Sequence, residues 1–402
     1  MTAERTEVAV IGGGVIGTSI TFRLAKAGKK VVLLEKNDLA TGSSGACDKC
    51  IFVQSKAPGI HLELALRSAE IYCDFSRELD YDIEYHPKGG MIAIENQEQM
   101  EIMEHVTARQ REGGLDVRLL PGDEARRREP VLAKHIVATA YSPQDAELNP
   151  FRLAHGFARA ARKLGAKVYN HTEVKGIGVE NGWANRVITD RGEIRADVIV
   201  NSAGVWAPFA GRMVGLEIPI KPRRGQILVT EPMPQMIGSV FLDARYIVVK
   251  YNPDLAKNAD SLAGRLGVAL SLGQADSGNI LVGACREFVG YDRNTTHEAL
   301  TTISRNALRI AAGLRGLRII RAFAGLRPYT PDGLPILGHV DGVKGFVMAA
   351  GHEGDGIALA AITGKLISEL VVSGQASVSL EPFRLSRFKI PEGKAQTGEK
   401  VS

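Results

Sequence analysis

The sequence predicts an α/β fold with a buried parallel sheet, interrupted twice by an α+β unit that is built on an antiparallel sheet. Three observations lead to this prediction. The chain opens with a strand, a glycine-rich turn, a helix and a second strand. Its middle contains short β-rich segments separated by turn residues, and the α/β pattern returns near the C-terminus. A chain of 402 residues is long enough for two such domains.

The opening pattern begins at Val8–Ile11, a continuous apolar run that is typical of a strand buried on both faces. The apolar residues of the next segment recur at helical spacing, and Gly28 marks the end of that helix. A second buried strand follows at Val31–Leu34. Later segments continue the α/β pattern: the amphipathic helix Phe151–Gly165, the strand Lys167–Asn170, a hairpin around Asp190–Gly192 and the strand Asp197–Asn201.

The inserted unit is predicted from five short segments that are rich in β-forming residues. These are Met91–Glu95, Gln226–Thr230, Tyr246–Tyr251, Gly267–Gly273 and Asn279–Gly283. After them come a strand at Phe346–Ala350, a glycine-rich turn at Gly351–Gly356 and a long helix at Ile357–Val372. We therefore expect residues 1–84, 145–214 and 319–388 to form the α/β domain, residues 85–144 and 215–318 the inserted domain, and residues 389–402 a polar tail.

Composition and charge are ordinary for a globular protein, with 45% hydrophobic and 24% charged residues. The net charge of +5 is modest and the basic residues are spread along the chain, so we expect no nucleic-acid partner. Four cysteines are too few for a disulfide framework and suit a reducing compartment. The apolar stretch Ile357–Val372 contains Lys365 and Glu369 and is shorter than the ~20 residues of a membrane span. With no secretory signal visible, we expect a cytoplasmic protein without a transmembrane segment.

Residues Gly12–Gly17 match the pattern G-x-G-x-x-G between a strand and a helix. In this setting Gly12 makes the tight turn, Gly14 lets a pyrophosphate approach the backbone, and Gly17 lets the helix pack closely on the strand. The start of the helix offers free N–H groups and a partial positive charge to phosphates. Glu35 ends the second strand, where an acid can accept hydrogen bonds from ribose hydroxyls. The motif predicts a dinucleotide site and leaves open which dinucleotide binds.

The segment Thr41–Gly45 reads Thr-Gly-Ser-Ser-Gly and follows Glu35 closely. Such a small, hydroxyl-rich loop can line a diphosphate and lead the chain toward the reactive part of a cofactor. The alternative is an ordinary solvent-exposed loop, which composition alone favours.

The run from Val8 to Gly45 resembles the D-amino acid oxidase superfamily of flavoproteins, which includes glycine oxidase and the sarcosine oxidases. Three later segments agree. Gly325–Pro335 resembles the family's G-x-R-P-x-T-P-D-G-x-P signature, and Gly351–Ile357 resembles its G-H-x-x-x-G-I turn. Asn201–Trp206 resembles the small-residue turn beneath the cofactor. The resemblance implies a Rossmann-like FAD-binding domain with an inserted antiparallel-sheet substrate domain.

The resemblance also implies which residues bind FAD, and that the helix after Gly356 directs its N-terminus at the electron-rich edge of reduced flavin. Asp355 could equally serve as the capping residue of that helix. The full set is Gly12, Gly14, Val15, Ile16, Gly17, Glu35, Lys36, Ser43, Ser44, Gly45, Val174, Ala203, Gly204, Trp206, Arg327, Gly351, His352, Gly354, Asp355, Gly356 and Ile357.

The chain departs from those family members that attach flavin covalently. Gly325 stands where monomeric sarcosine oxidases carry a cysteine. Asn149 and Pro150 precede Gly156–Arg159, where a β subunit of multimeric sarcosine oxidase has a flavin-linking histidine. We therefore expect FAD to be bound non-covalently.

Arg327 is the main candidate for substrate binding. In the resembled family the arginine of the matching motif holds the α-carboxylate, and a guanidinium can do so with two parallel hydrogen bonds. This geometry would place the Cα hydrogen toward the flavin. The alternative is an arginine that pairs with Asp332 and holds its own loop.

His352, Gln226, Cys47 and Cys50 are further candidates. His352 is a candidate catalytic residue, although a histidine beside a glycine turn is more often packed there, and oxidation of a neutral amine needs no protein base. Gln226 and Cys47 are candidates for substrate binding, with a structural role open for Gln226. Cys47 and Cys50 form C-x-x-C, for which small buried residues are favoured over a redox or metal-binding pair. We expect no metal site.

These observations predict FAD-dependent oxidation of an α-amino or imino acid to the imine, with hydride passing to flavin N5. Gln54–Lys56 and Gly351–Ile357 resemble catalytic β subunits of multi-subunit opine, proline or hydroxyproline dehydrogenases. An alternative is therefore a subunit that passes electrons to a partner, and we expect an oligomer. A flavin-binding scaffold without turnover stays open as well. So does a nicotinamide-dependent dehydrogenase, which the segments around Arg327 and His352 disfavour.

Overall fold

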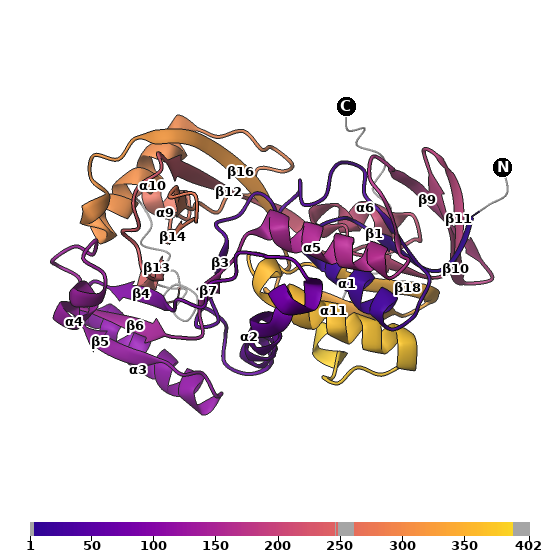
Figure 1. The fold of residues 1–402 in the computed structure, drawn as a ribbon, viewed down its shortest axis with the longest axis horizontal. Helices are drawn as coiled ribbons and strands as arrows, with labels where there is room; N and C mark the ends of the chain where they lie inside the picture. The colour runs from indigo at the N-terminus through magenta and orange to yellow at the C-terminus, as the bar shows by residue number, and fades with distance from the viewer. Residues whose placement is uncertain (1–3, 246, 248–260, 389–402) are drawn as a thin grey trace.

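The computed structural model describes residues 4–245, 247 and 261–388, whose helices and strands form two lobes (Figure 1). The lobe that contains both ends of the described chain is α/β. The other lobe, on the left in Figure 1, is built around a second large sheet. This arrangement confirms the predicted fold class.

The α/β lobe contains a sheet with the strand order β17-β18-β10-β11-β1-β2-β8, and β9 pairs with β10. Strands β18, β11, β1, β2 and β8 run parallel, with β8 at one edge of the sheet, and β9–β10–β11 form an antiparallel meander. Central parallel strands are covered on both faces, which explains their continuous apolar runs. The strand bounds are β1 Glu4–Ile11, β2 Val31–Leu34, β8 Lys167–Tyr169, β9 Val174–Glu180, β10 Trp183–Thr189, β11 Gly192–Asn201, β17 Ile336–Val340 and β18 Val343–Ala350.

Helix α1 packs against both α5 and α11, and α2 also packs against α11. By length and composition α11 could cross a membrane, but most of its residues are buried among these neighbours. Burial within the lobe accounts for its apolar sequence. The helix bounds are α1 Val15–Lys26, α2 Ile60–Leu79, α5 Pro150–Lys163, α6 Ala207–Arg212 and α11 Gly356–Ser373.

The second lobe has a sheet with the strand order β16-β12-β15-β14-β13-β4-β6-β5. Its own apolar core lies between this sheet and α10. The strand bounds are β4 Gly90–Ile94, β5 Arg118–Pro121, β6 Ala138–Ser142, β12 Lys221–Thr230, β13 Val240–Asp243, β14 Ser271–Gln274, β15 Ile280–Gly283 and β16 Ile319–Tyr329. The helix bounds are α3 Gln97–Glu112, α4 Gly122–Arg128, α9 Leu262–Arg265 and α10 His297–Ile310.

Two details of this lobe differ from the sequence prediction. The sheet is not purely antiparallel, because β13 pairs with β4 in parallel. Strand β16, expected within the α/β domain (residues 319–388), pairs with β12 along its length, from Ile319 opposite Thr230 to Tyr329 opposite Lys221. The predicted strand Tyr246–Tyr251 lies largely outside the described residues.

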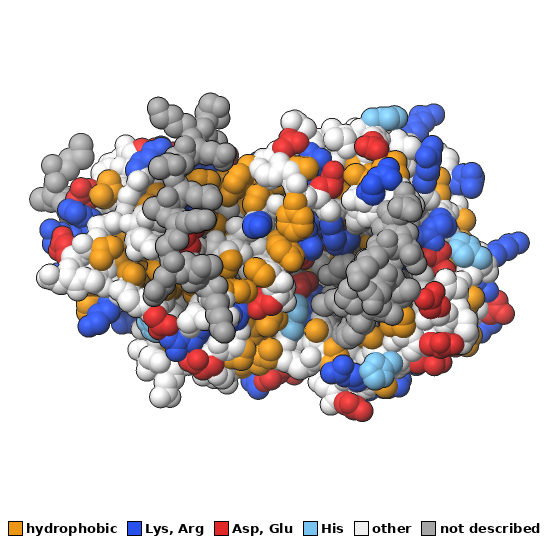
Figure 2. All heavy atoms as spheres, turned by 180° about the vertical axis from the view of Figure 1, so that it is seen from behind, with side chains coloured by type: hydrophobic (Ala, Val, Ile, Leu, Met, Phe, Trp, Pro, Cys, Tyr) orange, Lys and Arg blue, Asp and Glu red, His pale blue; other side chains and the backbone are white. Residues whose placement is uncertain are grey.

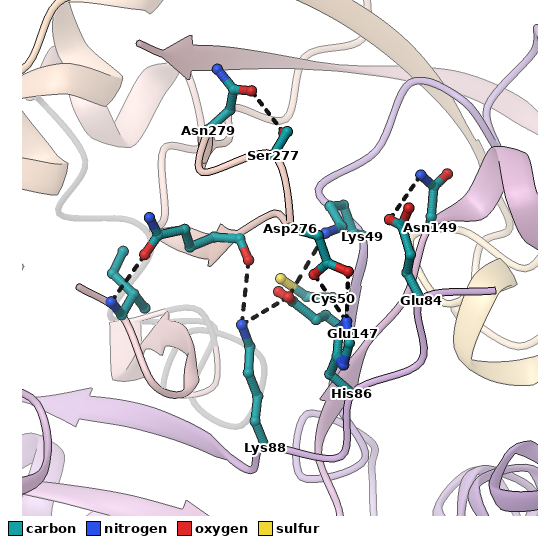
Figure 3. A network of polar contacts seen from close by, with 12 residues as sticks. Lys49, Cys50, Glu84, His86, Lys88, Glu147, Asn149, Asp276, Ser277 and Asn279 are labelled. Atoms are coloured by element: carbon teal, nitrogen blue, oxygen red, sulfur yellow. Dashed lines mark hydrogen bonds and ion pairs between the residues drawn. The ribbon is translucent and has the colours of Figure 1, made fainter. Parts of the chain in front are cut away.

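A small sheet of β3 (Cys50–Ile51) and β7 (Ala146–Glu147) lies where the lobes meet, beside a polar network (Figure 3). The buried Glu147 carboxylate accepts a hydrogen bond of 2.7 Å from Lys88 and lies 3.7 Å from the Lys49 ammonium. Lys88 also donates to the Gln274 carbonyl. The network therefore ties the segment around Lys49 to the second sheet.

Charged side chains of both signs are interspersed over the face shown in Figure 2. Ion pairs at the protein surface include Lys167 with Glu4 and Lys163 with Asp80. Exposed pairs of this kind contribute only about 0–1 kcal/mol each to stability. The fold therefore depends on the buried sheets and helices rather than on the surface charges.

Candidate active site

A cavity of about 680 Å³ opens at the carboxyl ends of the central parallel strands. Its wall includes Ile11 at the end of β1, Leu34 at the end of β2, and Ala350 at the end of β18. Open α/β sheets bind ligands at this edge. The volume lies in the range of ~300–1,000 Å³ that is typical of cofactor and ligand sites.

The glycine turn Gly12–Gly17 forms the part of the cavity wall next to the start of α1. Gly12 has a φ of +107°, and a Cβ atom there would lie 2.6 Å from the Ser202 carbonyl oxygen. A Cβ on Gly17 would lie 1.9 Å from the Gly12 carbonyl oxygen. Gly14 is the N-cap of α1, whose first turn carries no acidic residue. The start of α1, with its helix dipole and no acidic residue in its first turn, therefore borders the cavity, which suits a diphosphate.

The loop Thr41–Gly45 is part of this site rather than an ordinary solvent loop. The Ser44 hydroxyl accepts a hydrogen bond of 3.1 Å from the backbone N–H of Val15, in the first turn of α1. Ser43 donates to the Leu326 carbonyl on β16. Both serines line the cavity, so the loop joins the start of α1 to the second lobe.

Glu35 holds the glycine turn in place and also faces the cavity. Its carboxylate accepts hydrogen bonds from the backbone N–H groups of Gly13 at 2.7 Å and Asn37 at 2.8 Å. An acceptor carboxylate in this position can also receive ribose hydroxyls.

An aromatic and apolar section of the wall surrounds Trp206. The Lys36 ammonium lies 4.3 Å from the centre of its ring, a distance typical of a cation–π contact. Val174, Phe209 and Met213 also line this section. Such surfaces suit the flat adenine part of a dinucleotide.

The glycine-rich turn before α11 forms another part of the wall. Gly351, His352, Gly354, Gly356 and Ile357 all line the cavity. The starts of α1 and α11 therefore border the same cavity.

Asp355 occupies the N-cap position of α11, but its side chain accepts no hydrogen bond from the helix. It lies 2.6 Å from the Lys56 ammonium and 3.2 Å from His61 Nε2 instead. Burial acts to raise the pKa of Asp355, but Lys56 and His61 hold it well below its usual range. The suggested capping role is therefore wrong, because the carboxylate pairs with Lys56 and lies beside His61 instead.

His352 is buried, and its Nε2 lies 3.1 Å from the Thr363 hydroxyl on α11. Burial lowers the pKa of His352 to about 3, because the charged imidazolium loses its hydration. The ring is therefore neutral near pH 7 and packs against the helix.

We predict that His352→Gln reduces the loss of stability in acid. The unfolded chain protonates His352 below a pKa of about 6.5, whereas the folded chain keeps it neutral down to about pH 3. Protonation then favours unfolding, so the wild type loses up to about 1.4 kcal/mol per pH unit in this window from this group. Urea unfolding at pH 6, 5 and 4 measures the slope. The exposed His155→Gln is the control, and identical slopes for wild type and His352→Gln would contradict the assignment.

Arg327 projects from β16 into the cavity. Its Nη1 donates a 3.0 Å hydrogen bond to the Cys285 carbonyl, and its guanidinium packs on Gly225, where a Cβ would lie 2.3 Å from Nη1. Asp332 accepts hydrogen bonds from Arg387, at 2.7 and 3.1 Å. The alternative pairing of Arg327 with Asp332 is therefore absent among the described contacts.

A second, smaller cavity of about 60 Å³ adjoins the first and shares Asp48, Arg327, Glu353 and Gly354 with it. This volume has room for a few water-sized groups. Of the other polar residues in its lining, Asp355 was a site candidate from the sequence. Ser55, Lys56, Ser271 and Arg286 were not proposed as site residues. Arg327 thus lies where a compact polar pocket opens into the long cavity.

Three cofactor candidates and one substrate candidate do not line the long cavity. Gly17 and Gly45 make backbone packing contacts instead, and Asp355 borders only the small cavity. Gln226 points to the other side of β12, where its amide donates to Glu287 at 3.0 Å and accepts from the Thr296 N–H at 2.8 Å. The remaining candidates line the cavity, together with residues such as Asp48, Thr172, Lys175 and Arg293 that the sequence did not indicate.

Cys47 lines the long cavity and Cys50 the small one, and neither forms a disulfide. Burial raises the pKa of the Cys47 thiol to about 12 and raises that of Cys50 as well. Both are therefore thiols at neutral pH, which disfavours a reactive pair. The described residues also contain no group of three or more His, Cys, Asp or Glu that could hold a metal ion.

Comparison with known proteins agrees with this geometry. The family model DAO, described as FAD dependent oxidoreductase, matches residues 7–370. Glycine oxidase of Geobacillus kaustophilus is 31% identical over 96% of this chain and 97% of that protein. Hydrogen cyanide synthase subunit HcnC of Pseudomonas protegens is 29% identical over 97% of this chain and 98% of that protein.

The fold agrees as well. The crystal structure of L-proline dehydrogenase from P. horikoshii superposes with a TM-score of 0.86 and 28% identity, and covers 96% of this chain and 98% of that chain. The structure of glycine oxidase from Geobacillus kaustophilus gives a TM-score of 0.84 and 27% identity, over 96% and 100%. The chain therefore belongs to the DAO family of FAD-dependent oxidoreductases, and FAD is its cofactor.

Proposed function

We propose that the protein oxidises an α-amino or imino acid to the corresponding imine. The observation that carries this proposal is the position of the Arg327 guanidinium, at the junction of the small polar cavity and the long cavity. A planar cation in this place suits the α-carboxylate of a compact substrate. Glycine oxidase and L-proline dehydrogenase, to which the chain is similar, act by name on such molecules.

The long cavity would hold FAD without a covalent bond. The start of α1 and the serine loop would face the diphosphate, Glu35 the ribose, and the surface around Trp206 and Val174 the adenine. The start of α11 would face the pyrimidine edge of the ring system. When bound, FAD would supply a two-electron acceptor for the hydride that leaves the substrate Cα.

The protein residues would mainly orient the substrate and exclude water. Arg327 would fix the carboxylate, so that the Cα–H bond is held toward the flavin-side cavity. We assign no general base, because His352 is neutral, buried and directed at Thr363. A substrate that binds as the neutral amine needs none.

Anaerobic flavin bleaching tests the proposal. Glycine, D- and L-amino acids, N-methylated amino acids, prolines and opines are added to the purified yellow protein, and the loss of flavin absorbance is followed. We expect bleaching by at least one of these amines and none by 2-hydroxy acids or NADH. Failure of every amine would contradict the proposed reaction and favour a flavin-binding scaffold.

A second candidate function is the amine-oxidising subunit of a larger dehydrogenase. It is favoured by the end-to-end similarity to HcnC, which is named as a subunit. In that case turnover with an artificial electron-accepting dye should greatly exceed oxygen consumption. Equal rates with dye and oxygen would favour an oxidase that works without a partner.

A further inference from the structure

The turn that precedes α11 carries two carboxylates, although it borders a site that must accept negative charge. Glu353 pairs with Arg223 on β12, and Asp355 pairs with Lys56. An anion near the flavin ring opposes reduction, because reduced flavin is itself electron-rich and anionic at its pyrimidine edge. The cations that compensate these carboxylates therefore matter for the redox chemistry.

Lys56 is held in one position by every hydrogen bond that its ammonium can donate. Its Nζ lies 2.6 Å from the Phe52 carbonyl, 2.9 Å from the Ser55 hydroxyl and 2.6 Å from Asp355 Oδ1. Only 2% of its surface is exposed. An ammonium with three donors in use and almost no contact with solvent is a fixed charge rather than a mobile one.

Asp355 links the fixed charge of Lys56 to the start of α11. It is the N-cap residue of α11, directly before the cavity-lining Gly356, and it also borders the small cavity. His61, on the first turn of α2, approaches its other carboxylate oxygen at 3.2 Å. The Asp355 carboxylate forms no capping hydrogen bond to α11, so its main interaction is the ion pair with Lys56.

We propose that Lys56, supported by His61, is a positioning residue that neutralises Asp355 at the start of α11 and thereby sets the redox potential of the bound FAD. This inference rests on the proposed orientation of α11 toward the flavin ring. Without Lys56, the Asp355 charge would cancel much of the stabilisation that the helix start gives to reduced flavin. Without Asp355, the Lys56 charge would add to it.

The test uses the FAD-loaded protein and a readout that needs no substrate. Sulfite adds to flavin N5 and places negative charge on the pyrimidine edge, so its dissociation constant reports how well the site supports that charge. A unit charge about 10 Å from the reacting group, at an effective dielectric of about 20, changes such an equilibrium about tenfold. For a two-electron couple the same change corresponds to about 30 mV in midpoint potential.

We expect Lys56→Met to raise the sulfite dissociation constant about tenfold and Asp355→Asn to lower it by a similar factor. The double variant Lys56→Met/Asp355→Asn should return to within about threefold of the wild type, because it removes both charges. Midpoint potentials from dye equilibration should follow the same order. If Lys56→Met does not fold, Asp355→Asn and the double variant still give the two diagnostic values.

Lys88→Met is the matched control. Lys88 also pairs with a buried carboxylate, that of Glu147 (Figure 3), but lines neither cavity, so its removal should leave the sulfite dissociation constant nearly unchanged. The inference would be overturned if Lys56→Met and Asp355→Asn shifted the sulfite dissociation constant in the same direction, or if the double variant did not return toward the wild-type value. Either result would indicate that the Lys56–Asp355 pair has only a structural role. If an amino acid bleaches the wild type but the variants do not show these shifts in the sulfite dissociation constant, only this inference is refuted. If the variants show these shifts but no amino acid bleaches the wild type, only the proposed reaction is refuted.

Discussion

Arg327→Ala is expected to raise KM for the amino acid substrate by about 100-fold or more. The substrate carboxylate would lose a charge-assisted, two-point contact, and the loss of one partner of such a pair costs about 2–5 kcal/mol. Because the carboxylate also orients Cα, kcat should fall as well. Steady-state kinetics with a dye acceptor measures both constants. Arg327→Lys should lie between wild type and Arg327→Ala, since lysine keeps the charge but not the planar fork.

The flavin spectrum must be recorded for each variant, because Arg327 also lines the long cavity. Asp332→Asn is the matched control: it weakens the pair with Arg387 just beyond β16 and leaves the cavity wall intact. We expect its KM to stay within about twofold of the wild type. If Arg327→Ala retained a wild-type KM together with a normal flavin spectrum, Arg327 would have no part in substrate binding.

The start of the chain could be interpreted well from sequence, since its signals are local. The strand β1, the glycine turn, helix α1 and the strand β2 follow one another within residues 4–34, and each has its own pattern. Glu35 falls at the end of β2, where the turn and the acid meet without help from distant residues. The second helix start at Gly356 was recognised for the same reason.

Gln226 shows where such an interpretation stops. Side chains alternate across a strand, so either Gln226 or its neighbours Gly225 and Ile227 face the cavity, but not both. The sequence indicated a strand and did not indicate which face meets the cofactor. In the structure Gly225 and Ile227 line the cavity, and Gln226 joins the network of Glu287 and Thr296.

Lys56 and β16 illustrate a different limit. Lys56 and Asp355 are about 300 positions apart in the chain, and no periodic pattern links two residues at that separation. Likewise β16 was grouped with the nearby α/β pieces, whereas its hydrogen bonds go to β12. Pairings that form only when the chain folds require the tertiary structure, and these same pairings bring Arg327 and the Lys56–Asp355 pair to the site.

Gly17→Ala is expected to yield a protein that retains little or no FAD. Its Cβ would lie 1.9 Å from the Gly12 carbonyl oxygen and 2.6 Å from the Ser202 hydroxyl oxygen. The two backbone segments cannot both keep their positions, so the start of α1 must move away from β1 and from the phosphate site. Overpacking of this kind also costs about 1–3 kcal/mol in stability. The ratio of flavin to protein absorbance after purification, followed by titration of the apoprotein with FAD, measures the effect.

Two more glycines provide a graded comparison. A Cβ on Gly14 would approach the Ser44 hydroxyl to 3.0 Å, a contact with a side chain that can rotate, so Gly14→Ala should fold and bind FAD more weakly. A Cβ on Gly176 in β9 would meet only Ile188 at 3.4 Å, which is ordinary contact, so Gly176→Ala should bind FAD as the wild type does. We expect FAD content to fall in the order wild type and Gly176→Ala, then Gly14→Ala, then Gly17→Ala, as the space around the added Cβ decreases. If Gly17→Ala purified with a full complement of FAD, the close approach of α1 to β1 could not be what positions the start of α1 for the diphosphate.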